Sequence, residues 1–136
     1  MSLPLALILV VHGGIHMGFL CSRSWPFEAG DPWLVTGLGA GSDTVAAIGA
    51  ALVLVAFFGF LLAALAAVGL LPRRLWRLTV VVASAASAVA LALFPTPGTV
   101  PGLVIDAVLL WSVLALAWSP TPLIGRRTRA GRPVTS

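Results

Sequence analysis

Two histidines and one aspartate are the residues of this sequence whose types and positions suggest chemistry. His12 and His16 are four residues apart in the apolar segment "VHGGIHMGFL", so a helix would place both on one face. Asp106 interrupts another apolar segment far along the chain. Because ionisable groups in apolar surroundings need partners, we expect Asp106 to pair with a histidine, with His16 as the first candidate and His12 as the next.

Three interpretations of this trio are open. In the first, the side chains only hydrogen-bond between helices. In the second, His12 and His16 hold a metal ion or a haem, and Asp106 is a third ligand or bonds to a ligand. In the third, the residues line a path for protons, quinone or another substrate.

The composition indicates that the segments carrying these residues lie in a membrane. The chain has 136 residues, of which 60% are hydrophobic and 9% are charged. A soluble domain has about a quarter of its residues charged. Four apolar segments approach or exceed the roughly 20 residues needed to cross a bilayer as a helix, namely residues 3–20, 45–71, 75–94 and 100–118.

We therefore expect an all-α fold, an integral membrane antiparallel four-helix bundle. The transmembrane domain is predicted to occupy residues 1–125, and the basic tail 126–136 is predicted to be disordered. Arg23 is the one arginine in the first loop, and the others flank the link between the second and third spans or lie in the tail. The positive-inside rule then predicts a multi-pass protein of the cell inner or plasma membrane with both termini cytoplasmic. The arginines form no patch suited to nucleic acid.

Small and aromatic residues predict how the helices pack. Gly14 and Gly18 form a G-x-x-x-G pair, which is typical of close helix packing in membranes. Trp76 and Trp118 are expected near the inner interface, whereas Trp111 is expected to pack more deeply. The two serines of the third span, Ser84 and Ser87, can bond to backbone carbonyls one turn back and therefore need no ligand.

The sequence favours a binding or accessory subunit over an enzyme. No serine, cysteine or lysine is spaced with a base in a way that suggests nucleophilic catalysis, and Cys21 is the single cysteine. The expected partners are the lipid bilayer and other membrane subunits or further copies of the chain. Two alternatives are a metal- or haem-binding redox anchor that uses His12 and His16, and a small transporter component.

The stretch "HGGIHMGF" resembles a group of small bacterial four-helix membrane proteins without an assigned activity. The matching positions are His12, Gly13, Ile15, His16, Gly18 and Phe19, and Gly98–Thr99 is similar to a Gly-Thr pair that precedes their last span. Pro95–Pro97 and Gly102 stand where that group often has Asp and Asn. The resemblance implies a four-helix membrane fold and draws attention to the histidine helix, but it implies no reaction.

Overall fold

The chain is described by a computed structural model over residues 2–21, 37, 39, 41–95 and 99–121. Regular structure in this part is helical, in four long helices: α1 (Ser2–Cys21), α3 (Ser42–Val68), α4 (Arg73–Leu93) and α5 (Thr99–Leu114). The predicted all-α class with four helices is therefore confirmed. The predicted tail 126–136 and most of the first loop lie outside the described residues.

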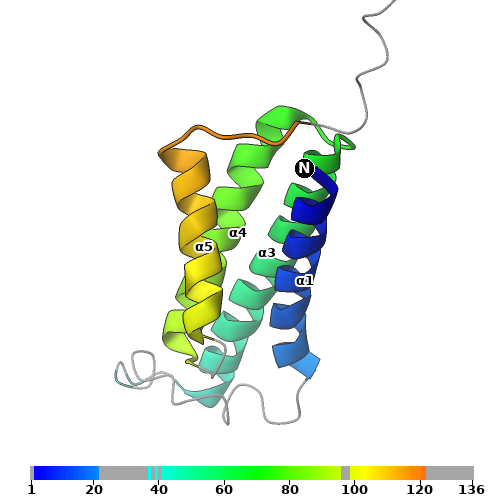
Figure 1. Ribbon diagram of the computed structural model, residues 1–136. Coiled ribbons are helices and arrows are strands. Elements are labelled where there is room, and N and C mark those ends of the chain that lie inside the picture. The colour runs from blue at the N-terminus through cyan, green and yellow to red at the C-terminus, as the bar shows by residue number, and fades with distance from the viewer. Residues whose placement is uncertain (1, 22–36, 38, 40, 96–98, 122–136) are drawn as a thin grey trace, which may run out of the picture.

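Consecutive helices run in opposite directions. The N-terminus of α1, the turn between α3 and α4, and the C-terminal end of α5 lie at the same end of the bundle (Figure 1). Two hydrogen bonds fasten this end, from Arg73 Nη2 to the Pro120 carbonyl at 3.2 Å and from Trp76 Nε1 to the Trp118 carbonyl at 3.3 Å. Each helix packs mainly on its neighbours in the chain, so the bundle is built in sequence order.

Two helices end earlier than the apolar segments predict. α3 ends at Val68 because Gly69 adopts a left-handed conformation with φ 94°, and its N–H bonds to the Ala66 carbonyl. Glycine accepts this conformation without steric cost, and it is a frequent helix terminator. α5 ends at Leu114, since the chain turns away through Ala117, which has a positive φ of 47°. The apolar sequence pattern continues past both points, but the backbone leaves the helical conformation there.

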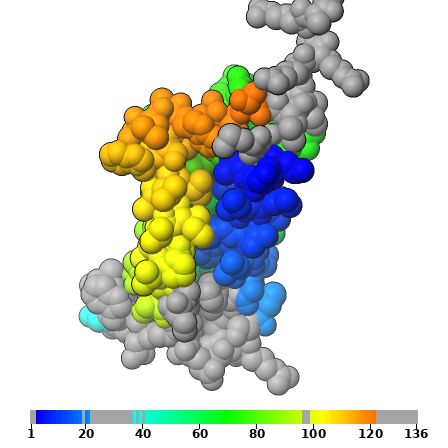
Figure 2. Space-filling model, in the orientation of Figure 1, coloured from blue at the N-terminus to red at the C-terminus, as the bar shows by residue number. Residues whose placement is uncertain are grey.

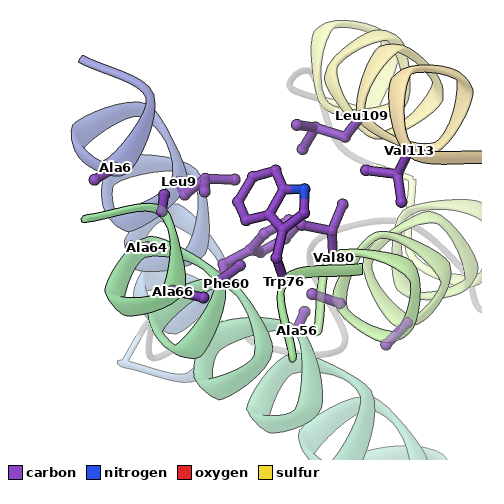
Figure 3. Close-up of a cluster of buried hydrophobic side chains, with 14 residues drawn as sticks. Ala6, Leu9, Ala56, Phe60, Ala64, Ala66, Trp76, Val80, Leu109 and Val113 are labelled. Atoms are coloured by element: carbon purple, nitrogen blue, oxygen red, sulfur yellow. The ribbon is translucent and has the colours of Figure 1, made fainter. Parts of the chain in front are cut away.

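Small residues bring α3 and α4 close together. A Cβ placed on Gly59 would lie 2.7 Å from Ala83 Cβ, so only glycine fits at this crossing. The main core lies around this contact and includes Phe60 and Trp76 (Figure 3). α1 and α5 complete it with Leu9 and with Leu109 and Val113, respectively. This core occupies the half of the bundle nearest the N-terminus of α1.

Large apolar side chains also cover the outside of the bundle. Trp111 is 66% exposed, so the prediction that it packs inside is wrong for this chain. Trp76, in contrast, is buried, and its ring makes an edge contact with Trp118 at a centroid distance of 5.9 Å. Each helix exposes several such residues, among them Leu7, Ile15, Val55, Phe58, Leu78, Val89, Val104 and Val108.

Two of the helices are long and apolar enough to cross a membrane by themselves. These are α3 and α4, and the apolar parts of α1 and α5, Leu3–Gly18 and Thr99–Leu114, are shorter. Length and composition alone also fit a core helix of a soluble protein. Whether polar or apolar side chains lie on the outside of the bundle therefore says more about a membrane position.

Candidate functional site: a buried polar layer

Three helices bring polar side chains to the same height of the bundle. α1 contributes His12 and His16, α4 contributes Ser87, and α5 contributes Asp106. At 1.5 Å per residue, Asp106 is about 10 Å from the start of α5, while His16 and His12 are about 7 and 13 Å from the end of α1. The carboxylate therefore lies between the two imidazoles in height, within reach of both.

Hydrogen bonds connect the four side chains in one continuous network. His12 Nε2 is 3.2 Å from Asp106 Oδ1, and Ser87 Oγ donates to Asp106 Oδ2 at 2.5 Å. Ser87 Oγ also lies 2.8 Å from His16 Nε2. All four residues are buried, with exposed fractions of 5% for His12, 2% for His16, 0% for Ser87 and 1% for Asp106. The polar layer, as we call these four residues, is thus buried and internally bonded.

The number of available protons fixes the direction of these bonds. A serine hydroxyl has one hydrogen, and Ser87 directs it to Asp106, so Ser87 must accept the hydrogen of His16 Nε2. A carboxylate only accepts, so His12 Nε2 donates to Asp106. Asp106 then receives two hydrogen bonds, and His12 Nδ1 is left as a hydrogen-bond acceptor.

Aromatic and glycine contacts hold the histidines in place. The rings of His12 and His16 meet edge to face with centroids 5.2 Å apart. His12 also packs edge to face against Phe60 of α3, with a centroid distance of 4.9 Å. A Cβ on Gly13 would lie 3.2 Å from Phe60 Cβ, so the glycine lets α1 approach α3 beside the histidine. α3 thus supports the polar layer by shape, without a polar side chain in it.

The structure brings together the three residues singled out from the sequence, with a different order of contacts. The sequence analysis named His16 as the first candidate partner of Asp106, but His12 makes the direct bond and His16 reaches Asp106 through Ser87. Neither serine of α4 uses the backbone bond that the sequence allowed, since Ser87 bonds to Asp106 and His16, and Ser84 Oγ has no partner among the described residues. The sequence could not show that only Ser87 reaches Asp106, because Ser84 and Ser87 both lie on the buried side of α4.

The glycine pair of α1 lies elsewhere. Gly14 and Gly18 are exposed, and no described atom beyond their own helix lies within 4 Å of a Cβ placed on either. The close approach within this chain is made by their neighbour Gly13. The packing role of Gly14 and Gly18 therefore stays a prediction that concerns contacts outside the described bundle.

The layer contains a serine beside a histidine, but the arrangement differs from that of a hydrolase. In a catalytic triad the acid bonds to the histidine and the histidine activates the serine. Here Asp106 bonds to Ser87 itself, and Ser87 is completely buried. A substrate would have no access to the hydroxyl, so the geometry favours a structural or binding role for Ser87.

Metal ligation through the Nε2 atoms of the histidines would require the polar layer to open. Each Nε2 atom of the two histidines already faces a partner, Asp106 or Ser87. Among the described residues, no group of three or more His, Cys, Asp or Glu side chains is arranged to hold a metal ion. A metal ion or haem bound through Nε2 would therefore compete with the bonds that join α1 to α4 and α5.

The fold and the site together define a helical bundle with apolar side chains on the outer faces of its helices and one buried layer of polar side chains inside. Protein-family models, curated proteins and solved structures yield no match to this chain. Its own geometry is thus the basis for assigning a function.

Proposed function

We propose that this protein is a small integral membrane subunit with a binding or accessory role, in which the polar layer joins three of the four helices. The observation that carries the proposal is the inverted distribution of polarity. Leu7, Val104 and Trp111 face outward, while Asp106 and both histidines are buried. Water disfavours such a surface, whereas lipid favours it.

The described charges support a membrane position. Besides Asp106 and the histidines, they are Asp43 at the start of α3 and Arg73, Arg74 and Arg77 at the start of α4. These positions lie at the two ends of the bundle, and the surface between them carries no described charge. The positive-inside rule favours the arginine end as the cytoplasmic side, with both termini on that side.

The exposed glycine pair supports association with another helix. Gly14 and Gly18 leave a shallow strip on α1 where a second helix can approach closely. An accessory subunit needs such a surface, whether its partner is another protein or another copy. The resemblance of "HGGIHMGF" to small bacterial membrane proteins is consistent with this role and names no substrate.

Thiol labelling tests the topology. The native Cys21 is exposed at the end of α1 opposite to the arginines, and Arg74→Cys in a Cys21→Ser background reports on the arginine end. In intact cells an impermeant maleimide should label Cys21, but it should label Arg74→Cys only after the cells are permeabilised. Labelling of Arg74→Cys in intact cells would contradict the orientation, and loss of the protein from carbonate-washed membranes would contradict insertion.

Cross-linking in native membranes tests the subunit role. We expect the wild-type chain to form a product larger than one copy, and Gly14→Leu with Gly18→Leu to abolish it. Val104→Leu, on the exposed face of α5, is the matched control. A wild-type chain that remains a single copy would contradict the role. Absorption spectra and metal analysis separate the redox-anchor alternative, which requires a haem band or stoichiometric metal.

A further inference from the structure

An open groove follows the seam between α1 and α5. Figure 2 shows these helices, blue and yellow, side by side on one face of the molecule. Two hollows of about 150 and 260 Å³ lie along the seam, and both are lined by His12, Ile15 and Ile105. Because they share these three residues, we treat them as one groove.

Both histidines lie at one end of the groove, and the other end is lined mainly by apolar side chains. The smaller hollow includes His12 and His16 together with Pro101 and Gly102 of α5. The larger hollow extends along α1 over Leu7, Ile8 and Val11. Among the described residues, no arginine or carboxylate lines either hollow, so this part of the chain offers no charge there to a phosphate or carboxylate headgroup.

His12 provides an acceptor at the junction of the two hollows. Its Nε2 bonds to Asp106, and no hydrogen bond to a described residue is found at its Nδ1. Among the described residues, Ser84 Oγ is the one side-chain nitrogen or oxygen that is both fully buried and without a hydrogen-bond partner. His12 Nδ1 also has no such partner, so part of its surface must remain accessible. A neutral imidazole whose Nε2 carries the hydrogen accepts a hydrogen bond at Nδ1. A ligand in the groove can satisfy this atom if it carries a hydroxyl group.

We propose that the α1–α5 groove binds a membrane-soluble alcohol, whose hydroxyl donates to His12 Nδ1 and whose apolar chain lies along Leu7, Ile8 and Val11. This inference depends on the proposed membrane position, because the groove opens on the lipid-facing side. Asp106 acts as a positioning residue, since it fixes which nitrogen of His12 carries the hydrogen. Binding is through one hydrogen bond and apolar contact, and involves no covalent or redox step.

The two histidines of the chain make a direct test possible. We would label the protein with ¹⁵N-histidine, insert it into phosphatidylcholine nanodiscs, and titrate it with farnesol, which is an isoprenoid alcohol. The His12 Nδ1 resonance should shift saturably toward the position of a hydrogen-bonded nitrogen, while the His16 nitrogens shift much less. Farnesyl methyl ether has the same apolar chain without the donor and should leave the Nδ1 resonance unchanged.

Variants locate the response in the groove. Ile105→Trp should block the groove and abolish the shift, and Ile15→Trp, at a half-exposed position, provides a second block if the first fails to fold. Val108→Trp adds the same ring to the outer face of α5, away from the lining, and should keep the shift. Equal shifts with farnesol and its ether, no saturable shift, or an unchanged response in a folded blocking variant would overturn the groove proposal. Failure of the wild-type chain to enter nanodiscs would instead overturn the membrane position.

Discussion

The two buried serines of α4 allow a test of the polar layer with matched substitutions. Ser84 and Ser87 are both completely buried, and they are three residues apart on the same helix. Ser87 makes two hydrogen bonds within the layer, whereas Ser84 Oγ makes none to a described residue. Changing each to alanine removes the same atom from similar surroundings, so the difference between the variants reports on the hydrogen bonds.

The magnitude follows from the groups left behind. Ser87→Ala deprives Asp106 of one of its two donors and leaves His16 Nε2 without its acceptor. A hydrogen bond to a charged group contributes about 1.5–3 kcal/mol in proteins, but hydrogen bonds between membrane helices average about 0.6 kcal/mol. Since two bonds are lost, we expect Ser87→Ala to lower the free energy of unfolding by about 2 kcal/mol. Ser84→Ala should change it by less than about 0.5 kcal/mol, because it removes an unpaired polar group.

The assay is reversible unfolding of the purified chain in mixed micelles at increasing SDS fraction, followed by tryptophan fluorescence. Trp76 lies in the core and reports on the loss of packing. The ¹⁵N-histidine spectrum gives an independent measurement, since Ser87→Ala should move the His16 Nε2 resonance and Ser84→Ala should not. Equal destabilisation by both variants would refute the hydrogen-bond network as the source of stability.

Three further predictions concern other contacts, each measured by the same unfolding assay. Gly59→Ala should destabilise the protein by about 1–3 kcal/mol because its Cβ would overlap Ala83, whereas an added Cβ at Gly37 meets nothing and Gly37→Ala should be neutral; equal effects would contradict the described crossing. Asp106→Asn keeps one acceptor oxygen and should cost about 1 kcal/mol, while Asp106→Leu removes both and should cost about 3 kcal/mol, with the reverse order contradicting the acceptor role. Trp76→Phe should cost about 1 kcal/mol and release the segment after α5, seen as faster amide exchange there, because the bond to the Trp118 carbonyl is lost.

Much of the fold was predictable because apolar segments mark where the helices lie. The start of α1 and the start of α5 were placed within one residue, at Ser2 and Thr99. The ends of α3 and α5 were not, since they depend on the backbone conformation of Gly69 and Ala117 rather than on hydropathy. Asp106 and the two histidines were named together from the sequence, because buried ionisable residues require partners, and the structure joins them in one hydrogen-bonded layer.

The contacts within that group could not be predicted. Whether Asp106 reaches His12 or His16 depends on the relative heights of α1 and α5 to within one helical turn, and hydropathy does not fix these. The role of Ser87 depends on the rotation of α4 about its axis, which also decides that Ser84 remains without a described partner. Similarly, a rotation of about 100° separates Gly13, which faces α3, from Gly14, which does not.

The polar layer has a consequence for how this bundle finds its alignment. Apolar side chains of neighbouring helices can pack at many relative heights, and in lipid no single height is strongly favoured by burial of apolar surface. A slip of α5 by a single turn, about 5.4 Å, would carry Asp106 away from both His12 and Ser87 and leave the carboxylate without either of its donors. The polar layer therefore fixes the relative heights of α1, α4 and α5, while the close packing of Gly59 against Ala83 positions α3.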